Sequence, residues 1–111
     1  MNATLVLVSA PSEEAARALG RALVEARLAA SVNIAPGIAS LYWWRGELRE
    51  AAEALVYAKT RADLADRVVA FVKARHPYDC PAILALPVAA GNPDYLAWIA
   101  QETAAQSAAQ S

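Results

Sequence analysis

Residues 38–59 read IASLYWWRGELREAAEALVYAK, and this stretch decides the fold. Arg45-Gly46-Glu47 divides it in two and predicts a hairpin turn. Large apolar side chains lie on both sides of the turn, as is typical of β-strands. Successive side chains of a strand point to opposite faces, so we expect Tyr42 and Trp44 on one face and Trp43 on the other. The stretch therefore predicts a long β-hairpin that carries bulky aromatic residues.

Outward from the hairpin, strands and helices follow in a recognisable order. We expect a strand over 4–8, a helix over 12–28, a strand over 31–44 with a bend at Pro36-Gly37, a strand over 48–59, a helix over 60–76, a strand over 83–88 and a last helix that opens at 91–94. This order predicts an α+β, ferredoxin-like (split βαβ) sandwich: an antiparallel sheet, helices on one face and an extra C-terminal helix. We expect residues 1–103 to form one domain and residues 104–111 a frayed tail.

The hairpin poses a burial problem in this fold. Two crossover helices can cover only one face of a four-stranded sheet, and no helix is left to cover the whole hairpin. Aromatic side chains on an uncovered sheet are unfavourable in water. Burial therefore predicts a partner chain and gives no more than "not a monomer".

Composition excludes several classes of protein. The chain has 111 residues, 58% of them hydrophobic, and a net charge of −1 with no basic run that would bind nucleic acid. No stretch approaches the ~20 apolar residues that would span a membrane. The single cysteine, Cys80, excludes an internal disulfide and fits a reducing compartment. The first residues lack the positive start of a signal peptide, so we expect a cytoplasmic protein without nucleic-acid or membrane partners.

Short segments along the chain share one pattern. They are LAASVNI at 28–34, PGI at 36–38, Tyr42 with Trp44, KTR at 59–61, HPY at 76–78 with Pro81, LPV at 86–88 and GNPDYLAWI at 91–99. In this order they resemble the CutA family, also called divalent-cation-tolerance proteins. The family commonly has Cys where this chain has Ser31, and a neutral hydroxyl is a poor ligand for soft metals. A metal role for that position is therefore in doubt.

The resemblance implies properties that the residues alone do not. It implies a tight homotrimer in which hairpins pair between chains, and a cytoplasmic or organellar setting. It also implies a role in tolerance to copper and other divalent metals. The trimer is similar to that of PII-type signalling proteins, which bind small ligands in clefts between subunits.

The candidate metal residues are His76, Asp79 and Cys80. Imidazole and thiolate together would suit Cu(I) or Zn(II), so copper is the one candidate cofactor. The spacing H-x-x-x-C is unspecific, and Pro77 argues against a helix that would place both side chains on one face. The alternative is that His76 caps the C-terminal end of the second helix, where a cation is favoured, and that Cys80 packs. Both interpretations stay open.

A second set of residues is a candidate for an inter-subunit cleft or an interface. Its aromatic members suit a protein interface, because such residues are the usual anchors there. Its two cations lie at a strand end, where they could hold an anion or remain a solvated pair. The set is Tyr42, Trp43, Trp44, Lys59, Arg61, Tyr78, Tyr95 and Trp98.

Catalysis is not expected. No Ser or Cys nucleophile has an orienting partner in the sequence, and the four glycines form no phosphate-binding loop. Three functions remain: a trimeric protein of divalent metal response that binds copper weakly, a PII-like regulator that binds a small anion or nucleotide between subunits, or a protein-interaction scaffold.

Overall fold

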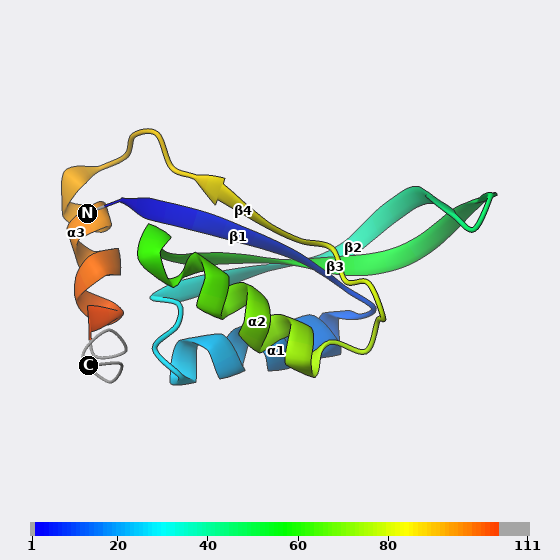
Figure 1. Cartoon of the computed structure of the whole chain (residues 1–111), viewed down its shortest axis with the longest axis horizontal. Coiled ribbons are helices and arrows are strands. Elements are labelled where there is room, and N and C mark those ends of the chain that lie inside the picture. The colour runs from blue at the N-terminus through cyan, green and yellow to red at the C-terminus, as the bar shows by residue number, and fades with distance from the viewer. Residues whose placement is uncertain (1, 105–111) are drawn as a thin grey trace.

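The structure of the chain, a computed structural model, describes residues 2–104 (Figure 1). Its elements are β1 Ala3–Ala10, α1 Glu13–Glu25, β2 Ser31–Trp44, β3 Glu47–Arg61, the 3-10 turn η1 Ala62–Leu64, α2 Ala65–Arg75, β4 Ile83–Pro87 and α3 Pro93–Glu102. The four strands form one antiparallel sheet in the order β2-β3-β1-β4. The predicted α+β, ferredoxin-like fold with its extra C-terminal helix is confirmed. The predicted tail begins at residue 104, and 105–111 lie outside the described residues.

The strands are placed as predicted, but two helix boundaries differ. α1 begins as predicted, because the Ser12 hydroxyl accepts a hydrogen bond from the Ala15 N–H at 3.1 Å. It ends at Glu25 rather than near residue 28, because Arg27 adopts the left-handed conformation (φ 61) that turns the chain. The predicted helix start at Thr60 is wrong, since Thr60 pairs with Thr4 inside the sheet and α2 starts only at residue 65.

The core lies between the sheet and two helices. Both α1 and α2 lie on one face of the sheet (Figure 1). Alternate residues of the two central strands point toward them, because the side-chain period of a strand is two. The fully buried strand residues on this face are Val6, Val8, Ala10, Ala54, Val56 and Ala58.

The opposite face of the sheet carries its own apolar side chains. Directly paired residues share a face, and the register pairs Leu5 with Leu86, Leu7 with Leu84 and with Tyr57, and Ser9 with Leu55. None of these large side chains is fully buried, and Leu84 is 62% exposed. We refer to Leu5, Leu7, Leu55, Tyr57, Leu84 and Leu86 as the bare face.

The β2–β3 hairpin extends well past the helices. A bulge between Ala35 and Ile38, with Gly37 at φ 69, bends β2 where the sequence predicts a bend. Beyond it, residues 38–53 form a twisted hairpin arm that projects from the body (Figure 1). The turn is Arg45-Gly46, with φ 51 and 80, which is the signature of a two-residue type I′ turn.

Helix α3 stands at the other end of the sheet, far from the hairpin arm (Figure 1). Asn92 caps it, Arg27 binds Glu102 at 2.8 Å, and the Ser31 and Tyr95 hydroxyls lie 3.3 Å apart. α3 therefore leaves the arm uncovered. Within residues 2–104, no helix is long and apolar enough to cross a membrane.

Candidate functional site

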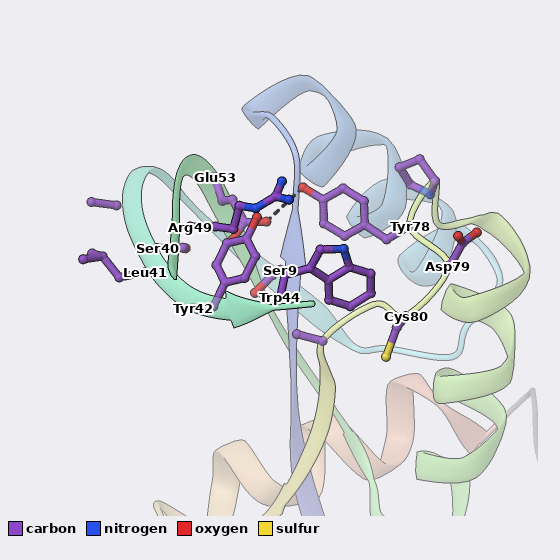
Figure 2. Close-up of a pocket in the computed structure, with 13 residues that line it drawn as sticks. Ser9, Ser40, Leu41, Tyr42, Trp44, Arg49, Glu53, Tyr78, Asp79 and Cys80 are labelled. Atoms are coloured by element: carbon purple, nitrogen blue, oxygen red, sulfur yellow. Dashed lines mark hydrogen bonds between the residues drawn. The ribbon is translucent and has the colours of Figure 1, made fainter. Parts of the chain in front are cut away.

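A cleft of about 840 Å³ opens between the hairpin arm and the loop that joins α2 to β4 (Figure 2). We call it the arm cleft. Its walls come from the end of β1, from both strands of the arm and from the loop. The lining residues are Ser9, Ala39, Ser40, Leu41, Tyr42, Trp44, Arg49, Glu53, Pro77, Tyr78, Asp79, Cys80 and Ala82.

The register of the arm determines which side chains face the cleft. Tyr42 lies opposite Arg49 across the two strands. Trp44 is an even number of residues from Tyr42 along β2, and Glu53 is an even number of residues from Arg49 along β3. All four side chains therefore lie on one face of the arm. Arg49 Nη2 binds Glu47 Oε1 at 3.0 Å, so its charge already has a partner. The Trp44 ring has a cation beside it, the Cζ of Arg45, which lies 5.5 Å from the ring centroid.

The loop contributes Tyr78, which reaches across to the arm. Its hydroxyl donates a hydrogen bond to Glu53 Oε2 at 3.0 Å (Figure 2). Partial burial, together with the hydrogen bond to the Glu53 carboxylate and its negative charge, raises the pKa of Tyr78 to about 12. The phenol therefore stays a donor throughout the physiological range, and this one bond links the two walls.

His76 lies behind the cleft and anchors the loop. It is buried and ends α2 as the C-cap residue. Its Nε2–H donates to the Ser9 carbonyl at 2.6 Å, and its Nδ1 accepts from the Tyr78 N–H at 3.1 Å. Both ring nitrogens are thus engaged in holding the loop against β1, so neither is available to a metal without breaking a hydrogen bond.

The three candidate metal residues are not gathered into a ligand set. Asp79 and Cys80 line the arm cleft, whereas His76 does not. Among residues 2–104, no three His, Cys, Asp or Glu side chains lie close enough to hold a metal ion together. Cys80 is exposed in the chain, so it does not pack as the alternative predicts. Copper at these residues stays a prediction without geometric support in one chain.

The predicted interface residues fall into separate places. Tyr42, Trp44 and Tyr78 meet in the arm cleft. Trp43 lies on the other face of the arm and is 74% exposed.

The remaining members lie at the α3 end of the sheet. Tyr95 and Trp98 stack on α3, with ring centroids 5.6 Å apart. Lys59 donates to the Asn33 side chain, and buried Arg61 lies 3.5 Å from Asp63. No single cleft in the described chain unites the whole set.

Sequence reasoning missed Ser9, Arg49 and Glu53. Ser9 pairs with Leu55, far away in sequence, so its place depends on the register of the sheet. Glu53 has its place because the loop that carries Tyr78 packs against the arm. The position of Arg49 could have been predicted from the sequence, because a two-residue turn at Arg45-Gly46 pairs Trp44 with Glu47 and therefore Tyr42 with Arg49.

Comparison with known proteins now identifies the fold's family. Residues 4–102 match the family model of the CutA1 divalent ion tolerance protein. This chain belongs to the CutA1 divalent ion tolerance family. The resemblance noted in the sequence is thereby confirmed.

Relatives of the CutA1 family come from bacteria, plants and animals. The divalent-cation tolerance protein CutA of Thermus thermophilus is 50% identical over 99 residues, which are 89% of this chain and 96% of that protein. The CutA homolog of Danio rerio is 45% identical over 98 residues, 88% of this chain but only 65% of its own length. The chain therefore spans nearly the full length of the Thermus protein but about two thirds of the Danio protein.

Solved CutA1 structures share the fold closely. CutA1 from Oryza sativa has a TM-score of 0.89 at 42% identity, covering 92% of this chain and 94% of that one. The CutA of Archaeoglobus fulgidus has a TM-score of 0.88 at 38% identity, with 91% and 98% covered, and is described as periplasmic. Relatives thus do not confirm the cytoplasmic location predicted for this chain.

The one departure from the family pattern has a structural role here. The hydroxyl of Ser31 lies 3.3 Å from that of Tyr95, so it helps to dock α3 on the sheet. The family name describes tolerance of ions and no catalysed reaction. That the chain is not an enzyme stays a prediction.

Proposed function

We propose that this chain works as a homotrimer in tolerance of divalent metal ions, copper among them, in the cytoplasm. The tolerance role is supported by the names of its relatives, which are called divalent-cation tolerance proteins. The assembly is supported by one structural observation, the bare face. The two parts of the proposal are tested separately.

The bare face carries the proposal of assembly. Its leucines and Tyr57 form a continuous apolar surface across β3, β1 and β4, on the side away from α1 and α2. Burying such a surface stabilises by roughly 25 cal/mol for each Å² removed from water. A contiguous apolar patch of this kind marks an interaction site. Identical copies supply a matching apolar surface, and the number three comes from the family resemblance.

The residues of one chain do not fit a resident copper ion. Both nitrogens of His76 are hydrogen-bonded, and Asp79 with Cys80 alone makes an incomplete set of ligands. Copper bound within a single chain is therefore not part of the proposed role.

The first test is native mass spectrometry of the full chain purified without added metal. We expect a species of three times the 11.7 kDa chain mass, with no stoichiometric metal. A single folded chain as the main species at micromolar concentration would refute the assembly.

The second test concerns the role. Cells that lack the gene should grow less well in elevated copper, and expression of this chain should restore growth. Equal growth with and without the chain would refute the tolerance role and leave the assembly intact.

A PII-like anion site at Lys59 and Arg61 is not favoured. Lys59 already donates to the Asn33 side chain, and Arg61 is buried beside Asp63. Each cation thus has a polar partner within the chain. No specific observation favours a scaffold over the tolerance role.

A further inference from the structure

The arm cleft has a lining that suits a small ligand. The rings of Tyr42, Trp44 and Tyr78 gather around it from two separate elements (Figure 2). Its volume, about 840 Å³, lies within the range of small-molecule pockets. Aromatic rings that surround a hollow can bind either a flat apolar ligand or a cation, because the face of each ring is electron-rich.

Charge decides between these two classes of ligand. The Glu53 carboxylate is half-buried and accepts one hydrogen bond, from the neutral hydroxyl of Tyr78. Within residues 2–104, no lysine or arginine forms an ion pair with it. A partly desolvated carboxylate without a cation is unfavourable, so Glu53 attracts positive charge.

The other charged groups of the cleft support the same sign. Asp79 adds a second carboxylate to the lining. Arg49 is the one cation in the lining among the described residues, and Glu47 offsets its charge at 3.0 Å. Arg45 is not part of the lining and lies over the Trp44 ring, 5.5 Å from its centroid. The raised pKa of Tyr78 reports the same environment, since its ionised form is disfavoured by burial and by Glu53.

We propose that the arm cleft binds a small organic cation with an alkylated ammonium head, held between Glu53 and the rings of Tyr42, Trp44 and Tyr78. Alkyl groups on the nitrogen contact the ring faces, and the charge faces the carboxylate. A bare metal ion is not the expected ligand, because no three His, Cys, Asp or Glu side chains of residues 2–104 lie close enough to hold one together. Every residue named here belongs to one chain, and the proposal requires that the cleft stay open in the assembly that the chain forms. It does not rest on the proposed metal role.

The proposal is tested with choline chloride as the probe. The full chain, in whatever assembly it forms, is titrated with choline by calorimetry and by tryptophan fluorescence. The matched control is 3,3-dimethyl-1-butanol, which has the same shape and no charge. We expect choline to bind with a Kd of about 1 mM or tighter. We expect the alcohol to bind at least about tenfold more weakly, because it cannot pair with Glu53.

Two variants separate charge from shape. Glu53→Gln keeps an oxygen that accepts the Tyr78 hydrogen bond, and it should weaken choline binding at least about tenfold. Glu50→Gln removes the same charge from the other face of the same strand and should leave binding unchanged, because Glu50 does not line the cleft. If choline does not bind to the wild type, the proposal is wrong, whether the cleft is empty or filled by a neighbouring copy. Equal binding of the alcohol, or unchanged binding by Glu53→Gln, overturns it as well.

Discussion

At the scale of single residues, the hydrogen bond from Tyr78 to Glu53 joins the two walls of the arm cleft. A phenol that donates to a carboxylate is stabilised in its protonated form, and the pKa of Tyr78 rises from its ordinary value of 10.0 to about 12. The folded pKa lies above the unfolded one, so the contribution of Tyr78 to the free energy of unfolding is complete below pH 10. It is lost as the pH rises from about 10 to about 12.

The first prediction follows from this contact. Glu53→Gln removes the negative charge and should lower the pKa of Tyr78 from about 12 toward its ordinary value. The measurement is a titration of absorbance at alkaline pH, read as the difference between each protein and the same protein with Tyr78→Phe. If the pKa of Tyr78 is the same in the wild type and in Glu53→Gln, then Glu53 does not act on the phenol.

The sequence predicted the aromatic residues of this site and Asp79, but not Glu53 or Arg49. Tyr42 and Trp44 stand out because they are large and follow a strand period. Glu53 is one acid among 11 in the chain, and only the packing of the loop against the arm gives it a role. His76 was also recognised, but its two hydrogen-bond partners depend on the loop conformation, which no spacing in the sequence encodes.

At the scale of elements, the hairpin arm depends on its turn. Arg45 and Gly46 both have positive φ, which glycine adopts without strain and an alanine does not. Gly46→Ala should therefore lower the free energy of unfolding by about 1 kcal/mol. Unfolding in urea, at one fixed protein concentration, provides the measurement.

Gly91→Ala is the matched control for that substitution. Gly91 does not have a positive φ, and an added Cβ would meet its nearest neighbour, Leu96, at an ordinary 3.5 Å. The expected change is within about 0.5 kcal/mol. Equal effects of the two substitutions would mean that the turn conformation is not what Gly46 provides.

Elements were predictable where a local signal marks them. The turn, the bulge at Gly37 and the caps at Ser12 and Asn92 use residues whose local preferences match the structure. The end of α1 was not, because Arg27 adopts a left-handed conformation in which glycine or asparagine is usual. Thr60 resembles a cap in sequence, but pairing with Thr4 draws it into the sheet instead.

At the scale of the whole molecule, the order of elements was enough to predict the fold. Two crossover helices must lie on one face of the sheet, and the sequence therefore also predicted an uncovered face. It placed that surface on the hairpin alone, however. The structure extends it to β1 and β4, where Leu84 and Leu86 lie opposite Leu7 and Leu5. Cross-strand register, which pairs residues about 80 positions apart, made this surface invisible to local patterns.

The bare face yields the last prediction, on the assembly. Leu84→Glu places a carboxylate at a position that is 62% exposed in one chain and would be buried between copies. Burying that charge without a partner is unfavourable, so the oligomer should dissociate at a protein concentration at least about tenfold higher than the wild type. Val24→Glu makes the same change at an exposed apolar position of α1, in the helix layer, and should leave the mass in solution unchanged. Sedimentation over a dilution series reads both, and circular dichroism checks that each variant is folded. If Leu84→Glu keeps the wild-type mass at every concentration, copies of the chain do not meet through this face, and another surface must hold the assembly together.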